Sequence, residues 1–151
     1  MENIIQILMA ALGSVGFAVL FNVRSKKLIL FFFGGALDWA VYLICVHLGA
    51  SLFVAQMFAT MTAALLAEVF ARVIHVPVLI LLVPMLIPLV PGEDLYYTMY
   101  RLIQGDNANF LFHARQAVVA AGAIVVGIIS ITALVQIWLS LCRSYHKLRK
   151  N

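Results

Sequence analysis

Long apolar stretches with short connections constrain the fold of this chain more than any other feature of its sequence. Residues 4–21, 28–48, 52–71 and 117–141 are each almost free of charged side chains. A helix of about 20 residues crosses the roughly 30 Å hydrocarbon core of a bilayer, so each stretch is long enough to span a membrane. The sequence therefore predicts an all-α, polytopic transmembrane bundle that forms one domain, residues 1–151.

The composition excludes a water-soluble domain. The chain is 65% hydrophobic and 11% charged, whereas soluble domains are about half apolar and about a quarter charged. The net charge of +4 does not indicate nucleic acid, because the basic residues form no stripe with interleaved aromatic side chains. A cleaved signal peptide is not expected either, since Glu2 is the only charged residue before Arg24.

A fifth apolar stretch, residues 76–103, is interrupted near residues 88–94. Pro88, Pro91 and Gly92 are followed at once by Glu93 and Asp94. In one interpretation a helix reaches the middle of the bilayer, unwinds at the prolines, and a half-helix capped by Asp94 completes a discontinuous fourth span. In the other interpretation the fourth span ends near Pro91 and the two acids stand in an external loop.

The discontinuous interpretation predicts a substrate site. Unpaired backbone is tolerated at membrane depth only where it lines a cavity or is buried in protein, and the N-terminus of a half-helix attracts a carboxylate. Tyr97 fits a pathway lining or an interfacial belt, and Arg101 fits an anion-neutralising residue or a marker of the outer interface. The predicted substrate-binding residues are Pro88, Pro91, Gly92, Glu93, Asp94, Tyr97 and Arg101.

Two acids inside the apolar stretches need separate explanations. Asp38 lies near the middle of residues 28–48 among apolar neighbours. It could carry a proton or orient substrate, or it could be a neutral acid bonded to a neighbouring helix. We predict Asp38 and Asp94 as the proton-coupling residues. Glu68 precedes Arg72 by four residues, which predicts a local ion pair.

The basic residues predict the orientation of the bundle. With five spans, three basic groups fall on one side of the membrane, and short basic loops are retained in the cytoplasm. The N-terminus is then outside and the C-terminus cytoplasmic. The three groups are Arg24, Lys26 and Lys27; Arg72; and Arg143, Lys147, Arg149 and Lys150.

A ridge of small residues on residues 52–71 predicts close helix packing. Its alanines recur every fourth residue and so share one helix face. A second candidate function follows: a non-catalytic membrane scaffold whose working surface is this ridge. The ridge consists of Ala55, Ala59, Ala63, Ala67 and Ala71.

No cofactor or metal site is predicted. Cys45 and Cys142 form no CxxC pair, the four histidines form no cluster, and no nucleotide-binding or hydrolase motif occurs. We therefore predict that the chain is not an enzyme. An intramembrane enzyme would require Asp38 and Asp94 to meet in space.

Two segments resemble a known family. GFAVLFNV at residues 16–23 with the following basic turn, and VPMLIPLVPGEDLYYTMYRLIQGD at residues 83–106, resemble the small integral-membrane subunit of the threonine/serine exporter family. The likeness covers most of the chain and the order of its elements. The PLVPG core followed by Gly105 and Asp106 is its most specific part.

This resemblance implies half of a secondary transporter in a bacterial cytoplasmic membrane. The implied partner is a second membrane subunit with its own PG…GD segment, and two five-span halves would form an inverted repeat. The implied substrates are threonine and serine, or small dicarboxylates, exported with the proton gradient. Glu93 and Asp94 depart from the family pattern, and two acids would repel a dicarboxylate unless one is protonated.

Overall fold

The structure is a computed structural model that describes the backbone of residues 1–23 and 27–148, with side chains to residue 141. Its regular elements are α1 (Glu2–Leu20), α2 (Leu28–His47), α3 (Leu52–Ile74), α4 (Val78–Leu86), the 3₁₀ turn η2 (Ile87–Leu89), α5 (Gly92–Ile103) and α6 (Asn107–Leu148). Within these described residues, four helices are long and apolar enough to cross a membrane, and α4–η2 with α5 forms a fifth, bent candidate. The predicted all-α membrane fold is confirmed.

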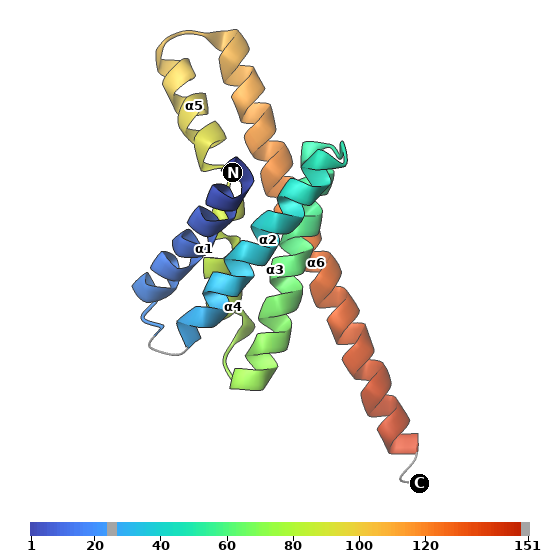
Figure 1. Cartoon of the computed structure of the whole chain (residues 1–151). Coiled ribbons are helices and arrows are strands. Elements are labelled where there is room, and N and C mark those ends of the chain that lie inside the picture. The colour runs from blue at the N-terminus through green and yellow to red at the C-terminus, as the bar shows by residue number, and fades with distance from the viewer. Residues whose placement is uncertain (24–26, 149–151) are drawn as a thin grey trace.

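Helix α3 is the centre of the bundle. It packs against α2, α4 and α6, while α1 packs mainly against α2 (Figure 1). The alanine ridge explains this position, because Ala55, Ala59, Ala63 and Ala67 are fully buried and Ala71 is nearly so. Small side chains let neighbouring backbones approach closely, and van der Waals contact then holds the helices together in lipid.

Glycines on α2 allow two further close approaches. A Cβ on Gly35 would stand 2.1 Å from the hydroxyl oxygen of Ser14 on α1, and one on Gly34 would stand 2.8 Å from Met85 on α4. Both glycines are buried on the same face of α2 as Phe31 and Asp38. This face therefore sets how closely α1 and α4 approach α2.

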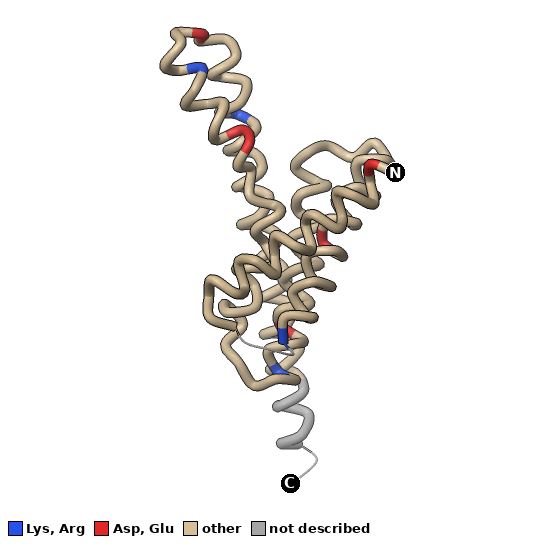
Figure 2. The backbone as a smooth tube through the Cα atoms, turned by 60° about the vertical axis from the view of Figure 1, so that its left-hand side comes forward, with Lys and Arg blue, Asp and Glu red and all other residues tan. Residues whose placement is uncertain are grey.

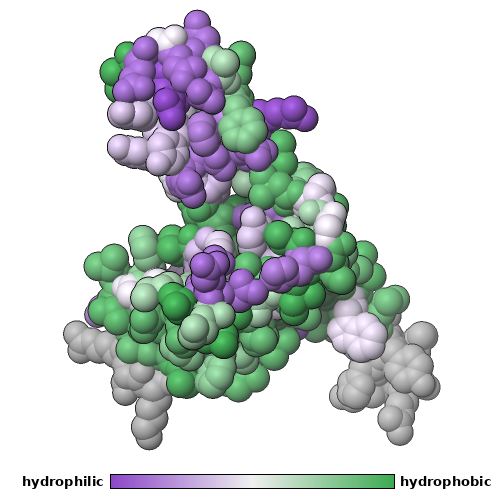
Figure 3. All heavy atoms as spheres, turned by 45° about the horizontal axis from the view of Figure 1, so that its top comes forward, coloured by the Kyte–Doolittle hydropathy of each residue, from purple (hydrophilic) through white to green (hydrophobic). Residues whose placement is uncertain are grey.

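The exterior of the bundle is apolar, as expected for a surface that contacts lipid. Large hydrophobic side chains are exposed along all the long helices. The space-filling view shows a mostly hydrophobic bundle below a hydrophilic projection (Figure 3). A water-soluble protein would not expose so much contiguous apolar surface.

The projection is a helical hairpin made of α5 and the first ten residues of α6, which we call the hairpin (residues 92–116). It extends beyond the ends of α1, α2 and α3 (Figure 1), and α5 packs chiefly against α6. The 42 residues of α6 span about 63 Å, more than the thickness of a bilayer. The helix begins ten residues before the span predicted at residues 117–141.

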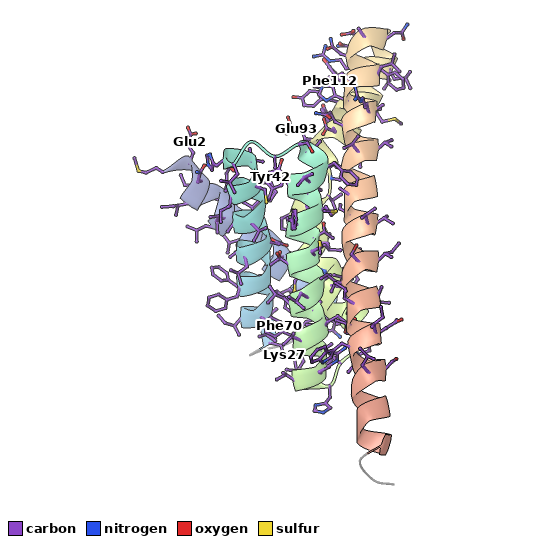
Figure 4. All side chains as sticks on the ribbon, turned by 90° about the vertical axis from the view of Figure 1, so that its right-hand side faces the viewer. Glu2, Lys27, Tyr42, Phe70, Glu93 and Phe112 are labelled. Carbon is purple, nitrogen blue, oxygen red and sulfur yellow. The ribbon has the colours of Figure 1, made fainter. Side chains whose placement is uncertain are left out.

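The two ends of the bundle differ in charge. Lys27 and Phe70 mark one end, and Glu2, Tyr42 and Glu93 mark the end from which the hairpin projects (Figure 4). Charged residues gather at the hairpin and at the opposite, basic end (Figure 2).

At the basic end Arg72 and Glu68 form the ion pair that their spacing predicts, at 2.8 Å. The other predicted cytoplasmic basic residues lie outside the described side chains: Arg24, Lys26, Arg143, Lys147, Arg149 and Lys150.

Candidate functional site

The fourth predicted span is broken at its prolines. The backbone leaves η2, becomes extended at Val90, and resumes as α5 at Gly92, with a bend of 57° between the two helical parts. Pro88 and Pro91 lack the N–H groups that would continue the helical ladder. The predicted discontinuity at a Pro-Gly segment is therefore confirmed.

The expected cap of the half-helix is wrong. Pro91, not Asp94, is the N-cap of α5, and Asp94 lies in the first helical turn. Gly92 does not have a positive φ, because Val90 and Pro91 make the turn. The acids still complement the positive end of α5, since negative charge in a first turn is stabilising.

The break lies nearer the hairpin end of the bundle than its middle. Gln56, one turn into α3, donates a hydrogen bond from its side-chain amide to the carbonyl oxygen of Leu89. One turn corresponds to a depth of about 6 Å from the start of α3. The segment thus has a feature of each sequence interpretation: a helix broken inside the bundle, followed by a half-helix that extends beyond it.

A pocket of about 300 Å³ opens beside the break. This volume is at the lower end of the range for small-molecule sites. Of the acids and bases described, Glu93 and Asp94 line it, and no Lys or Arg does. The pocket is lined by residues 88–94, which include both acids, and by Trp39, Tyr42, Leu52, Gln56 and Ala120.

Five of the predicted substrate-binding residues line this pocket: Pro88, Pro91, Gly92, Glu93 and Asp94. The other two lie elsewhere on the hairpin. Tyr97 stacks on the ring of His113 on α6, with centroids 5.1 Å apart. Arg101 is near the hairpin tip, 3.5 Å from Asp106.

Asp38 lies on the buried face of α2 and does not line the pocket. Its exposed fraction is 0%. Neither carboxylate oxygen has a hydrogen-bond partner among the described residues. An unpaired buried acid is unusual because it forgoes the hydrogen bonds that compensate for lost hydration. Asp38 thus remains a candidate proton carrier that is separate from the pocket.

The structure adds residues that the sequence interpretation missed. Trp39 and Tyr42 on α2 and Gln56 on α3 also line the pocket. His113 Nδ1 lies 2.8 Å from Asp94 Oδ1. The turn at Gly105 was a usable signal, because an antiparallel hairpin centred there brings residue 94 close to residue 113.

The hairpin tip is held by a second polar cluster. Asn109 donates hydrogen bonds from its side chain and its backbone to the carboxylate of Asp106, at 2.6 and 3.3 Å. These bonds, together with the nearby Arg101 guanidinium, lower the pKa of Asp106 below its usual value. Asp106 thereby caps the first turn of α6.

No group of three His, Cys, Asp or Glu side chains arranged to hold a metal ion occurs within the described residues. The acids at the pocket are Glu93 and Asp94, and His113, which does not line the pocket itself, is paired with Asp94. Such a site can accept hydrogen bonds, attract a cationic group and exchange protons.

Comparison with known protein families gives one match: the threonine/serine exporter family, ThrE, over residues 6–134. No curated protein and no solved structure matches the chain. The family match covers most of the chain, including α2 to α5, most of α1 and α6, the pocket and the hairpin. The chain is therefore a multi-pass membrane protein that belongs to the threonine/serine exporter family, a family of transporters.

Proposed function

We propose that this chain is the small membrane subunit of a two-component secondary transporter that exports small amino acids, threonine and serine foremost, with coupling to protons. The observation that carries the proposal is the broken α4–α5 segment, which lines a pocket with two carboxylates. Broken helices are a common way for secondary transporters to present backbone polar groups to a substrate. Family membership supports the transport of amino acids.

The charge of the pocket favours an amino acid over a dicarboxylate. Glu93 and Asp94 can attract the ammonium group of a zwitterion, whereas they repel a second carboxylate. The N-terminus of α5 and the hydroxyl group of Tyr42 are available for the single carboxylate, whereas Trp39 Nε1 already donates to Gln6. A dicarboxylate would bind only with at least one of the four acids protonated.

The proposed orientation has the N-terminus and the hairpin outside and the C-terminus in the cytoplasm of a bacterial cell. Lys27 and Arg72 support it, since Lys27 lies near Phe70 of α3 at the end opposite the hairpin (Figure 4) and Arg72 follows Phe70 by two residues on α3. The largely hydrophilic surface of the hairpin also fits a position outside the hydrocarbon core (Figure 3). We place the substrate pocket near the outer side of the membrane on the same grounds.

The proposed partner is a second membrane subunit with a broken segment of its own, related to this chain as an inverted repeat. The extensive apolar surface of α1, α2 and α6 is available for lipid and for such a subunit. Alternating access would come from rocking one half against the other. Asp38 and Asp94 would carry the coupled proton.

The scaffold alternative loses its main support. It assigned the alanine ridge to a partner, but the ridge is buried against this chain's own helices. The enzyme alternative needed Asp38 and Asp94 to act as a pair. Asp94 is paired with His113, and Asp38 lies outside the pocket.

Efflux from vesicles tests the proposal. The chain is co-expressed with its partner half, and the release of radiolabelled threonine from loaded vesicles is followed with and without a pH gradient. We expect Pro91→Leu with Asp94→Asn to abolish efflux. The matched control, Pro77→Leu with Glu68→Gln, changes one proline and one acid away from the pocket and should preserve it. Equal efflux from both double variants would defeat the site assignment.

A further inference from the structure

Of the two acids that line the pocket, Asp94 is the one with a close side-chain partner, which is His113. The Nδ1 atom of His113 lies 2.8 Å from Oδ1 of Asp94, with the two side chains 20% and 27% exposed. The imidazole plane is fixed by Tyr97, which stacks on it at 5.1 Å and 25°. His113 is thus a held, partly buried partner of a pocket residue that solvent can still reach.

We propose that His113 is a positioning residue that sets the affinity of the pocket according to pH, by competing with the substrate's ammonium group for the carboxylate of Asp94. This inference rests on the proposed function. Neutral His113 donates its Nδ1–H to Asp94 and leaves the negative charge of the carboxylate uncompensated. When Nε2 takes a proton from the adjoining solvent, the imidazolium neutralises that charge, and an ammonium group is held less tightly.

The position of the pair explains why it can act on the pocket without unfolding the hairpin. Asp94 is at the pocket end of α5, whereas Arg101 and Asp106 hold the tip. Arginine stays charged at all physiological pH values, so only the pocket end has a contact that changes near neutrality. No residue of α5 is fully buried, and its contacts with α6 include the Asp94–His113 pair and the stacking of Tyr97 on His113.

The neighbouring ionisable groups do not remove this response. Glu93, the residue before Asp94, adds a second negative charge at the pocket, whereas Arg115 lines a different pocket, two residues beyond His113 on α6. Tyr97 on α5 stacks on His113, and Tyr42 on α2 lines the pocket. Gln56, the polar pocket residue of α3, carries no charge.

The direction of the effect suits export. With the pocket near the outer side, an acidic exterior protonates His113 and weakens the hold on the ammonium group, so the substrate leaves. In a less acidic compartment His113 is neutral again, and the negative charge of Asp94 is available to the ammonium group. Each time the pair changes state, one proton binds at Nε2 of His113. No covalent bond to the substrate is made or broken.

Titration of the histidine tests the coupling independently of transport. The chain, labelled at histidine and held in lipid nanodiscs, is followed by NMR from about pH 5 to 8, with His113 assigned from His113→Gln. We expect Asp94→Asn to lower the midpoint of His113 and to leave that of His47 unchanged. His47 is the matched control, because it lies at the same end of the bundle and bonds to Asn3. An unchanged His113 midpoint would overturn the proposal.

Threonine binding to the complex of both subunits supplies the second readout. The wild type should bind about tenfold more weakly at pH 5 than at pH 8, the effect of one unit of coupling. His113→Gln keeps a donor for Asp94 but cannot titrate, so its affinity should vary little with pH, while His47→Gln should behave as the wild type. If His113→Gln keeps the pH dependence of the wild type, the proposed role of His113 is wrong, while the proposed function is unaffected. Absence of threonine binding by the wild type at every pH rejects the proposed function and this inference with it.

Discussion

The side-chain amide of Gln56 on α3 donates a hydrogen bond to the backbone carbonyl oxygen of Leu89, the last residue of η2. In a continuous helix that carbonyl would accept from the N–H of residue 93. The turn at Val90 and Pro91 removes that donor, and Gln56 replaces it. Gln56 is 5% exposed, so water does not offer an equal alternative.

Replacing Gln56 should therefore destabilise the break. We expect Gln56→Leu to cost about 1–3 kcal/mol, because the buried carbonyl of Leu89 would be left unpaired. Thermal unfolding of the purified protein in one detergent gives the comparison. Gln136→Leu is the matched control, since Gln136 is exposed on α6 and the same change there should leave the Tm equal or higher. Equal Tm values for wild type and Gln56→Leu would show that the hydrogen bond is not needed.

The α1–α2 contact leads to a second prediction. Gly35→Ala places a methyl group 2.1 Å from Ser14 Oγ and 3.0 Å from the carbonyl oxygen of Ala10, so the two helices must separate. Overpacking of this kind costs about 1–3 kcal/mol. Gly13→Ala, where no atom lies within 4 Å, should be neutral.

A paired change tests the cause of that loss. Ser14→Gly in the Gly35→Ala background removes the hydroxymethyl group that the new methyl group would strike, and it should restore most of the lost stability. Unfolding in detergent for the two single variants and the double variant gives the coupling directly. If the stability losses of the two single variants simply add in the double variant, the loss in Gly35→Ala does not come from its contact with Ser14.

Much of the fold could be predicted because the controlling features are local in the sequence. The apolar stretches, the i, i+4 alanines from Ala55 to Ala71 and the prolines near Pro88 each act over a few residues. The Glu68–Arg72 ion pair is of the same kind, and the structure contains it. Such patterns determine where helices form and break and which faces can pack closely.

The rest of the site depends on contacts between distant residues. Gln56 and Leu89 are 33 positions apart, and Asp94 and His113 are 19 apart. These pairs come together only because α4 and α5 are bent relative to each other and because α6 begins at Asn107, before the predicted span. A hydropathy pattern fixes neither, because the hairpin alternates apolar and polar residues and reads equally as a buried half-helix or an external loop.

The hairpin tip should respond to acid. The pKa of Asp106 is lowered by its bonds to Asn109 and by Arg101, so the folded pKa lies below that of the unfolded chain. The contribution of Asp106 to stability is then fully present above about pH 4, and it is lost as the pH falls through the folded pKa. Amide hydrogen exchange should show the first turn of α6 losing protection below about pH 4. Asp106→Asn should remove this dependence, and identical profiles for the two proteins would contradict it.

Asp38 allows stability and coupling to be separated. Its carboxylate is fully buried and has no partner among the described residues, so ionisation there is costly. Asp38→Asn removes the ionisable group at nearly constant volume, and we expect a Tm equal to or above that of the wild type. If Asp38 carries the coupled proton, threonine efflux from the two-subunit complex will no longer respond to a pH gradient. Glu68→Gln is the control, because that acid belongs to the ion pair at the basic end and its loss should leave the response intact. A gradient response retained in Asp38→Asn would exclude Asp38 as the carrier and leave the Asp94–His113 pair as the candidate.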